Sequence, residues 1–133
     1  MNRPWPAWFS PTVIDLAPAR FGPFPASRTL TAAGDVTLVP VPGHTPGQLA
    51  VVVEEGDHSI FLAGDSSYTQ DAMLRGTADG VGADEQSELL THRRIRAYAE
   101  TTPTVYLPAH DPESASRLTH RRTVGATAPR AAA

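Results

Sequence analysis

Residues 36–65 read VTLVPVPGHTPGQLAVVVEEGDHSIFLAGD, and this stretch decides the fold. Its β-branched and apolar runs at residues 36–40, 49–53 and 59–63 predict three strands. The middle run is apolar throughout, which is typical of a strand that is covered on both faces. Gly56 and Asp57 predict a hairpin turn between the second and third strands.

The loop between the first two strands encloses His44 between prolines and glycines, in the order PGHTPG at residues 42–47. Each proline fixes its own φ and restricts the residue before it. The glycines allow backbone turns that a side chain would forbid. Such a stiff loop loses little entropy on folding, so it suits holding one metal ligand in place. A rigid turn with a surface histidine is the alternative interpretation.

Two further strands end in residues that can bind a metal. The run at residues 59–63 is followed by Gly64 and Asp65, and a strand-like run at residues 104–107 is followed by PAHD at residues 108–111. We therefore expect His44, Asp65 and His110 to lie together at one edge of the sheet, although 21 and 45 residues separate them in sequence.

PGHTPG, AGD at residues 63–65 and PAHD, in this order, resemble the C-terminal half of the metallo-β-lactamase superfamily. GDSSYT at residues 64–69 places Tyr68 three residues after Asp65. Together with the terminal His-Asp pair, this is most similar to N-acyl homoserine lactone lactonases. The resemblance covers residues 21–118. It implies an α+β fold, a partial αββα sandwich in which a mixed sheet has flanking helices.

The resemblance also implies a metal-dependent hydrolase that opens lactone rings, as in quorum quenching. His44 would bind the first metal, Asp65 would bridge both metals, and His110 would bind the second. Tyr68 would donate a hydrogen bond to the substrate carbonyl or its oxyanion, so Asp65 and Tyr68 are the expected catalytic residues. The implied cofactor is zinc, as two ions in the complete site, with iron or manganese as alternatives.

The superfamily's upstream HxHxDH segment is absent from this sequence. The histidines are His44, His58, His92, His110 and His120. Each metal would keep one histidine and a share of Asp65, whereas a catalytic zinc has at least three protein ligands. We therefore expect a truncated copy of the fold with an incomplete site. The expected partners are a small ester or lactone substrate and either a complementing N-terminal half or a second copy of the chain.

Two other functions stay open. A glyoxalase II-like thioesterase is the alternative within the superfamily, although Tyr68 and the sequence AHD at residues 109–111 disfavour it. The other is a non-catalytic remnant or interaction subunit, in which the ligand-like residues are inherited but idle. An in-frame HxHxDH segment upstream of Met1 would favour the hydrolase over the remnant.

The composition narrows the classes of function. The length of 133 residues leaves room for one domain. The net charge of −3 gives no reason to expect a nucleic acid or an anionic membrane as partner. The absence of cysteine leaves only nitrogen and oxygen ligands for a metal. The sequence has neither an apolar run that could span a bilayer nor a secretory signal, so we expect a cytoplasmic protein.

Three parts are expected along the chain: an irregular segment rich in proline and aromatic residues at 1–31, the half-domain at 32–118, and a disordered tail at 119–133. Aromatic residues of the first segment either lean on a neighbouring surface or wall a substrate pocket.

Residues 84–101 predict the main helix, and shorter helices are expected at residues 70–74 and up to Leu118. His92 is expected at the surface or boundary of the main helix. His58 is expected to be a solvated turn residue on the far side of the sheet, and His120 a solvated tail residue.

Overall fold

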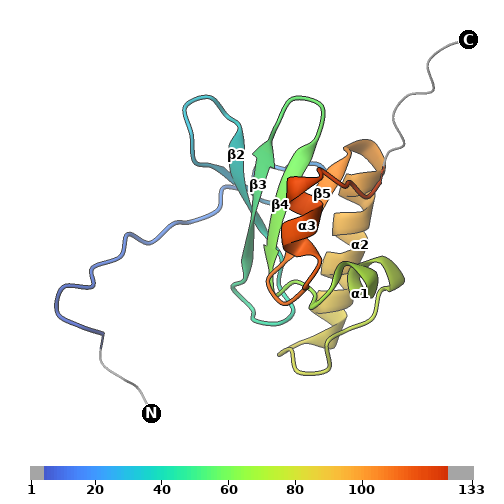
Figure 1. The fold of residues 1–133 in the computed structure, drawn as a ribbon. Coiled ribbons are helices and arrows are strands. Elements are labelled where there is room, and N and C mark those ends of the chain that lie inside the picture. Colours follow the sequence, from blue (N-terminus) through green and yellow to red (C-terminus); the bar gives the residue numbers. More distant parts are fainter. Residues whose placement is uncertain (1–4, 126–133) are drawn as a thin grey trace, which may run out of the picture.

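The computed structural model describes residues 5–125 as a mixed sheet with flanking helices (Figure 1). The strands are β1 (Arg28–Thr29), β2 (Val36–Pro40), β3 (Leu49–Glu54), β4 (Ser59–Gly64) and β5 (Thr104–Pro108). The helices are α1 (Gln70–Arg75), α2 (Glu85–Thr101) and α3 (Ser114–Thr119). The elements expected from the sequence are therefore confirmed to within a few residues.

The strands lie in sequence order, and their directions bring three strand ends to one edge of the sheet. The pairs from β1 to β4 are antiparallel, whereas β4 and β5 are parallel. A parallel pair needs a long crossover connection, which α1 and α2 provide. Because β2, β4 and β5 run in the same direction, the segments that follow them start at the same edge. These segments carry His44, Asp65 and His110.

One face of the sheet forms the core, with α2 packed against it. Val52, Phe61 and Tyr106 are cross-strand neighbours on this face and are fully buried. The core comprises Phe24, Val39, Val41, Ala50, Val52, Phe61, Ala63, Met73, Ile95, Tyr98 and Tyr106. Helix α2 begins after Asp84, whose carboxylate accepts hydrogen bonds from the N–H groups of Gln86 and Ser87 as an N-cap.

The opposite face of the sheet is apolar and partly open. Leu49 and Leu62 are 38% and 43% exposed on it, and Val51, Val53 and Ile60 are half-buried. An open, apolar sheet face of this kind agrees with the partial αββα sandwich that was expected. The expectation that the middle strand is covered on both faces is wrong for residues 5–125, because no second sheet lies over its outer side.

The core extends beyond residues 32–118. Phe24 is fully buried against Phe61 and Tyr98, and Val124 packs on the core and exchanges backbone hydrogen bonds with Thr104. Much of the N-terminal segment runs away from the sheet, where Trp8 is 81% exposed (Figure 1). Of the tail predicted at 119–133, residues 126–133 lie outside the described residues.

Within residues 5–125, none of the helices combines the length and the apolar character that crossing a membrane requires.

Candidate metal centre

Asp65 lies between the two histidines that were predicted as metal ligands. Its Oδ1 is 3.1 Å from Nε2 of His110, and its Oδ2 is 3.8 Å from Nε2 of His44. Each oxygen of one carboxylate therefore faces the Nε2 atom of a different imidazole. The structure thus brings these three predicted residues together, at the sheet edge where β2, β4 and β5 end.

Tyr68 lies beside both imidazoles. Its ring centre is 6.2 Å from that of His44 and 5.2 Å from that of His110. The side chain is 36% exposed, so it reaches solvent at the same place. All four residues predicted for the site are therefore neighbours in space.

The donor set fits a bridging carboxylate with one histidine on each side. Oδ1 of Asp65 is buried, and its 3.1 Å contact with Nε2 of His110 lacks hydrogen-bond geometry. It therefore accepts no hydrogen bond from the described residues, which is costly unless another group satisfies it. A zinc ion takes imidazole nitrogen and carboxylate oxygen as ligands. Within residues 5–125, however, no three histidine, aspartate or glutamate side chains converge as a ready ligand set. The residues therefore fit part of a metal site but not a complete ligand shell.

His44 is held from its other side by Asp79, a residue that the sequence analysis missed. Nδ1 of His44 is 2.9 Å from Oδ2 of Asp79, whose side chain is 1% exposed. This hydrogen bond raises the pKa of His44 above its ordinary value. Burial alone would raise the pKa of Asp79, but the N–H groups of Val81 and Gly82 and the His44 ring lower it overall.

Comparison with known proteins assigns the fold. No protein-family model matches the chain. Over 58 residues it is 41% identical to the "Probable metallo-hydrolase Rv2300c" of Mycobacterium tuberculosis (strain ATCC 25618 / H37Rv), a match that covers 43% of this chain and 17% of that protein.

Among solved structures, a quorum-quenching N-acyl homoserine lactone hydrolase matches with a TM-score of 0.53 and 27% identity, over 59% of this chain and 33% of that chain. The fold is a partial metallo-β-lactamase αββα sandwich. A second N-acyl homoserine lactone hydrolase, with N-hexanoyl-L-homoserine at its catalytic metal centre, matches this fold with a TM-score of 0.55 and 24% identity. That match covers 65% of this chain and 35% of the other. The chain thus spans about a third of these two hydrolases.

In this partial metallo-β-lactamase fold, three polar side chains of α2 hold the loops of the site. The Thr91 hydroxyl donates to the carbonyl of Pro42, which precedes the His44 turn, at 2.7 Å. Nε2 of His92 donates to the carbonyl of Ser66, next to Asp65, at 2.7 Å. Glu88 accepts from the N–H of Asp79 at 2.9 Å. The helix thereby ties together the loops that carry His44, Asp65 and Asp79.

The expectation that His92 lies at the helix surface or boundary is wrong, because its side chain is fully buried. Glu88 and Thr91 are each 1% exposed beside it. This polar stripe faces inward because α2 packs on loops with free carbonyl and N–H groups as well as on the sheet. Burial raises the pKa of Glu88 and lowers the pKa of His92, so both shifts favour the neutral forms.

We expect acid to destabilise the fold through His92. Its folded-state pKa lies below the ordinary value of 6.5, so the unfolded chain takes up the proton first. The stability that the neutral ring contributes is present above pH 6.5 and is lost as the pH falls through the lowered folded-state pKa. His92→Gln retains an N–H donor for Ser66 but does not titrate.

Urea unfolding between about pH 8 and pH 5 measures this difference. The unmodified chain should lose stability relative to His92→Gln on acidification, whereas His120→Gln, at an exposed position, should follow the unmodified chain. A stability difference between the unmodified chain and His92→Gln that does not change with pH would contradict the buried neutral imidazole.

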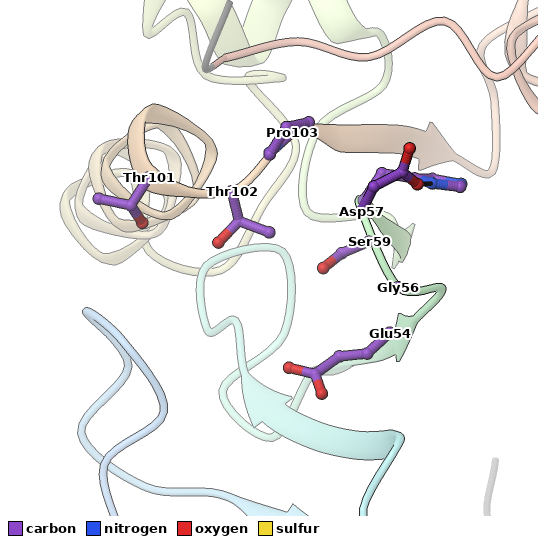
Figure 2. A pocket seen from close by; sticks show the side chains of 8 residues that line it. Glu54, Gly56, Asp57, Ser59, Thr101, Thr102 and Pro103 are labelled. Atoms are coloured by element: carbon purple, nitrogen blue, oxygen red, sulfur yellow. Dashed lines mark hydrogen bonds and ion pairs between the residues drawn. The ribbon is translucent and has the colours of Figure 1, made fainter. Parts of the chain in front are cut away.

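A pocket lies at the opposite end of the sheet and shares no residue with the candidate metal centre. The pocket has a volume of about 370 Å³. It lies between the β3–β4 hairpin and residues 101–103 (Figure 2). His58 lines it, on the far side from the strand ends as expected. The expectation that His58 is solvated is wrong: it is 8% exposed, and Nδ1 of its ring lies 2.7 Å from Oδ1 of Asp57.

Proposed function

We propose that the chain provides part of the active site of a metal-dependent hydrolase that opens N-acyl homoserine lactones, the activity of quorum-quenching enzymes. The observation that carries this proposal is the position of Asp65, with its two oxygens facing Nε2 of His44 and Nε2 of His110. A carboxylate in this position suits the bridge between paired metal ions. The lactone hydrolases among the solved structures support the choice of substrate class.

In this proposal, His44 and His110 would each contribute a ligand to one zinc ion, and Asp65 would contribute a carboxylate oxygen to each. When bound, paired zinc ions supply Lewis-acid polarisation of the substrate carbonyl and lower the pKa of a water molecule. Tyr68, beside both imidazoles and open to solvent, donates a hydrogen bond to the carbonyl oxygen as negative charge develops on it. The rigid 42–47 loop and α2 keep the ligands in place.

The ligand count predicts that the 133-residue chain alone binds zinc weakly and opens lactones poorly. The open sheet face with Leu49 and Leu62 offers a surface for a complementing half that carries an HxHxDH segment. Fusing the chain to that half of a related lactonase should supply the missing ligands. We therefore expect metal uptake and lactone hydrolysis to return in the fusion. That the chain associates with a second copy of itself, and that it lies in the cytoplasm, remain predictions from the sequence.

The experiment measures bound zinc and proton release from N-hexanoyl homoserine lactone, for the chain alone and for the fusion. Zinc uptake with ring opening in the fusion, and a reduced rate in Tyr68→Phe with its zinc retained, would support the proposal. About two tightly held zinc ions and full activity in the chain alone would contradict the incomplete site. A metal-loaded fusion that cleaves a small acyl thioester but no lactone would indicate the thioesterase instead. A fusion that binds no zinc would contradict the hydrolase and favour the interpretation of the chain as a non-catalytic subunit.

A further inference from the structure

We propose that Asp79 is a positioning residue that sets the tautomer and orientation of His44, so that Nε2 is left unprotonated and faces Asp65. The inference rests on the proposed function for its purpose, since a metal ligand needs a free Nε2. Asp79 lies 35 residues from His44 in sequence, in the loop between α1 and α2.

The hydrogen bond at Nδ1 determines which nitrogen carries the proton. An ionised carboxylate can only accept, so the 2.9 Å contact between Oδ2 of Asp79 and Nδ1 of His44 requires the proton on Nδ1. The other nitrogen, Nε2, then has its lone pair free on the side of Asp65, 3.8 Å from Oδ2 of that residue. Metal-binding histidines in general donate their second N–H to such a partner.

Asp79 is itself held by backbone groups, independently of His44. Its Oδ1 accepts hydrogen bonds from the N–H groups of Val81 and Gly82, both at 2.8 Å. Its own N–H donates to Oε1 of the buried Glu88 at 2.9 Å. The backbone N–H and Oδ1 of Asp79 are thus both held by hydrogen bonds, and its side chain is 1% exposed. The carboxylate therefore has little freedom to turn away from the imidazole.

The loop that carries Asp79 is also bonded directly to the turn that carries His44. The N–H of Ala83 donates to the carbonyl of His44, and the N–H of Asp84 donates to the carbonyl of Gly43, each at 3.1 Å. A Cβ on Gly82 would lie 3.2 Å from Cα of His44, so the two loops are in close contact. The backbone of His44 and the carboxylate that orients its ring therefore move as one unit.

Asp79→Asn separates positioning of the ring from support of the loop. The Asn carbonyl can still accept from Val81 and Gly82, but its NH₂ group would then face Nδ1 of His44. The proton of the neutral ring should consequently shift to Nε2, the nitrogen that must be free to bind a metal. If Asp79 only anchored the loop, Asp79→Asn would leave the tautomer of His44 unchanged.

The test is a multiple-bond ¹H–¹⁵N NMR spectrum of the histidine rings in the metal-free chain at about pH 9, well above the ordinary imidazole pKa of about 6.5. His44 should be protonated at Nδ1 in the unmodified chain and at Nε2 in Asp79→Asn, with backbone resonances distant from the site unchanged. Asp57→Asn is the matched control, because His58 makes the same kind of contact with Asp57 at 2.7 Å. It should alter His58 and leave His44 as it is.

Protonation of His44 at Nε2 in the unmodified chain, or the same His44 tautomer in Asp79→Asn, would overturn the inference. A zinc titration of the same samples extends the test, with an expected loss of about 10–100-fold in affinity at His44 in Asp79→Asn. Unchanged affinity despite a changed tautomer would also overturn it. The tautomer is read without metal, so this part of the test does not depend on zinc binding or on the proposed function.

Discussion

Asp65→Ala is expected to remove zinc uptake and lactone hydrolysis from the fused protein. The loss should exceed the about 10–100-fold that removing an outer partner of a metal site costs. The reason is that one substitution removes both oxygens, the one facing His110 and the one facing His44. Both ions would lose a ligand and the link between them at once. Bound zinc and the rate of ring opening are the two measurements.

Asp71→Ala is the matched control for the loss of a carboxylate. Asp71 lies on α1, where its side chain is 67% exposed and pairs with Arg75 in the next turn. An exposed pair of this kind contributes little to stability, so zinc content and rate should stay unchanged. A fused Asp65→Ala protein that retains two zinc ions would show that Asp65 is not the bridge.

Gly43→Ala is expected to destabilise the fold more than any other single methyl group added to the PGHTPG loop. A Cβ at this position would lie 2.5 Å from Cα of Glu88, and φ of Gly43 is +151°. The atom in the way is helix backbone, so relief requires a shift of α2 itself. Overpacking of this kind costs about 1–3 kcal/mol, and the positive φ adds strain of about 1–3 kcal/mol.

Gly47→Ala is the control in the same loop, since a Cβ there would meet nothing within 4 Å. Urea unfolding of both variants gives the comparison, and Gly47→Ala should stay close to the unmodified chain. Equal midpoints for the two variants would contradict the close approach of the loop to α2. Because α2 also holds the Asp65 and Asp79 loops, Gly43→Ala should lower zinc affinity as well.

Strands β2 to β5 and the three strand-end residues could be predicted from the sequence because local patterns encode them. Alternating and continuous apolar runs fixed β2 to β5, and Asp84 followed by an acidic turn marked the start of α2. His44, Asp65 and His110 were found because each follows such a run within a short motif. Their shared edge then follows from strand direction.

Asp79, Glu88 and His92 could not be predicted in the same way, because each acts across a large sequence separation. Asp79 bonds with His44, 35 residues away, and His92 bonds with Ser66, 26 residues away. A polar residue on a helix normally faces water, and nothing local signals that α2 packs its polar stripe on loops. Val124 was missed for a related reason, since a segment rich in alanine gives no period that reveals a core contact.

Zinc titration of the 133-residue chain, followed through the ring signals of its five histidines, tests the central claim most directly. The claim is that His44, Asp65 and His110 bind metal together. His44 and His110 should respond jointly, at lower zinc concentration than the exposed His120, while His58 and His92 stay unchanged, and Asp65→Ala should abolish the joint response. Equal responses at all exposed histidines, or a joint response that persists in Asp65→Ala, would contradict the account.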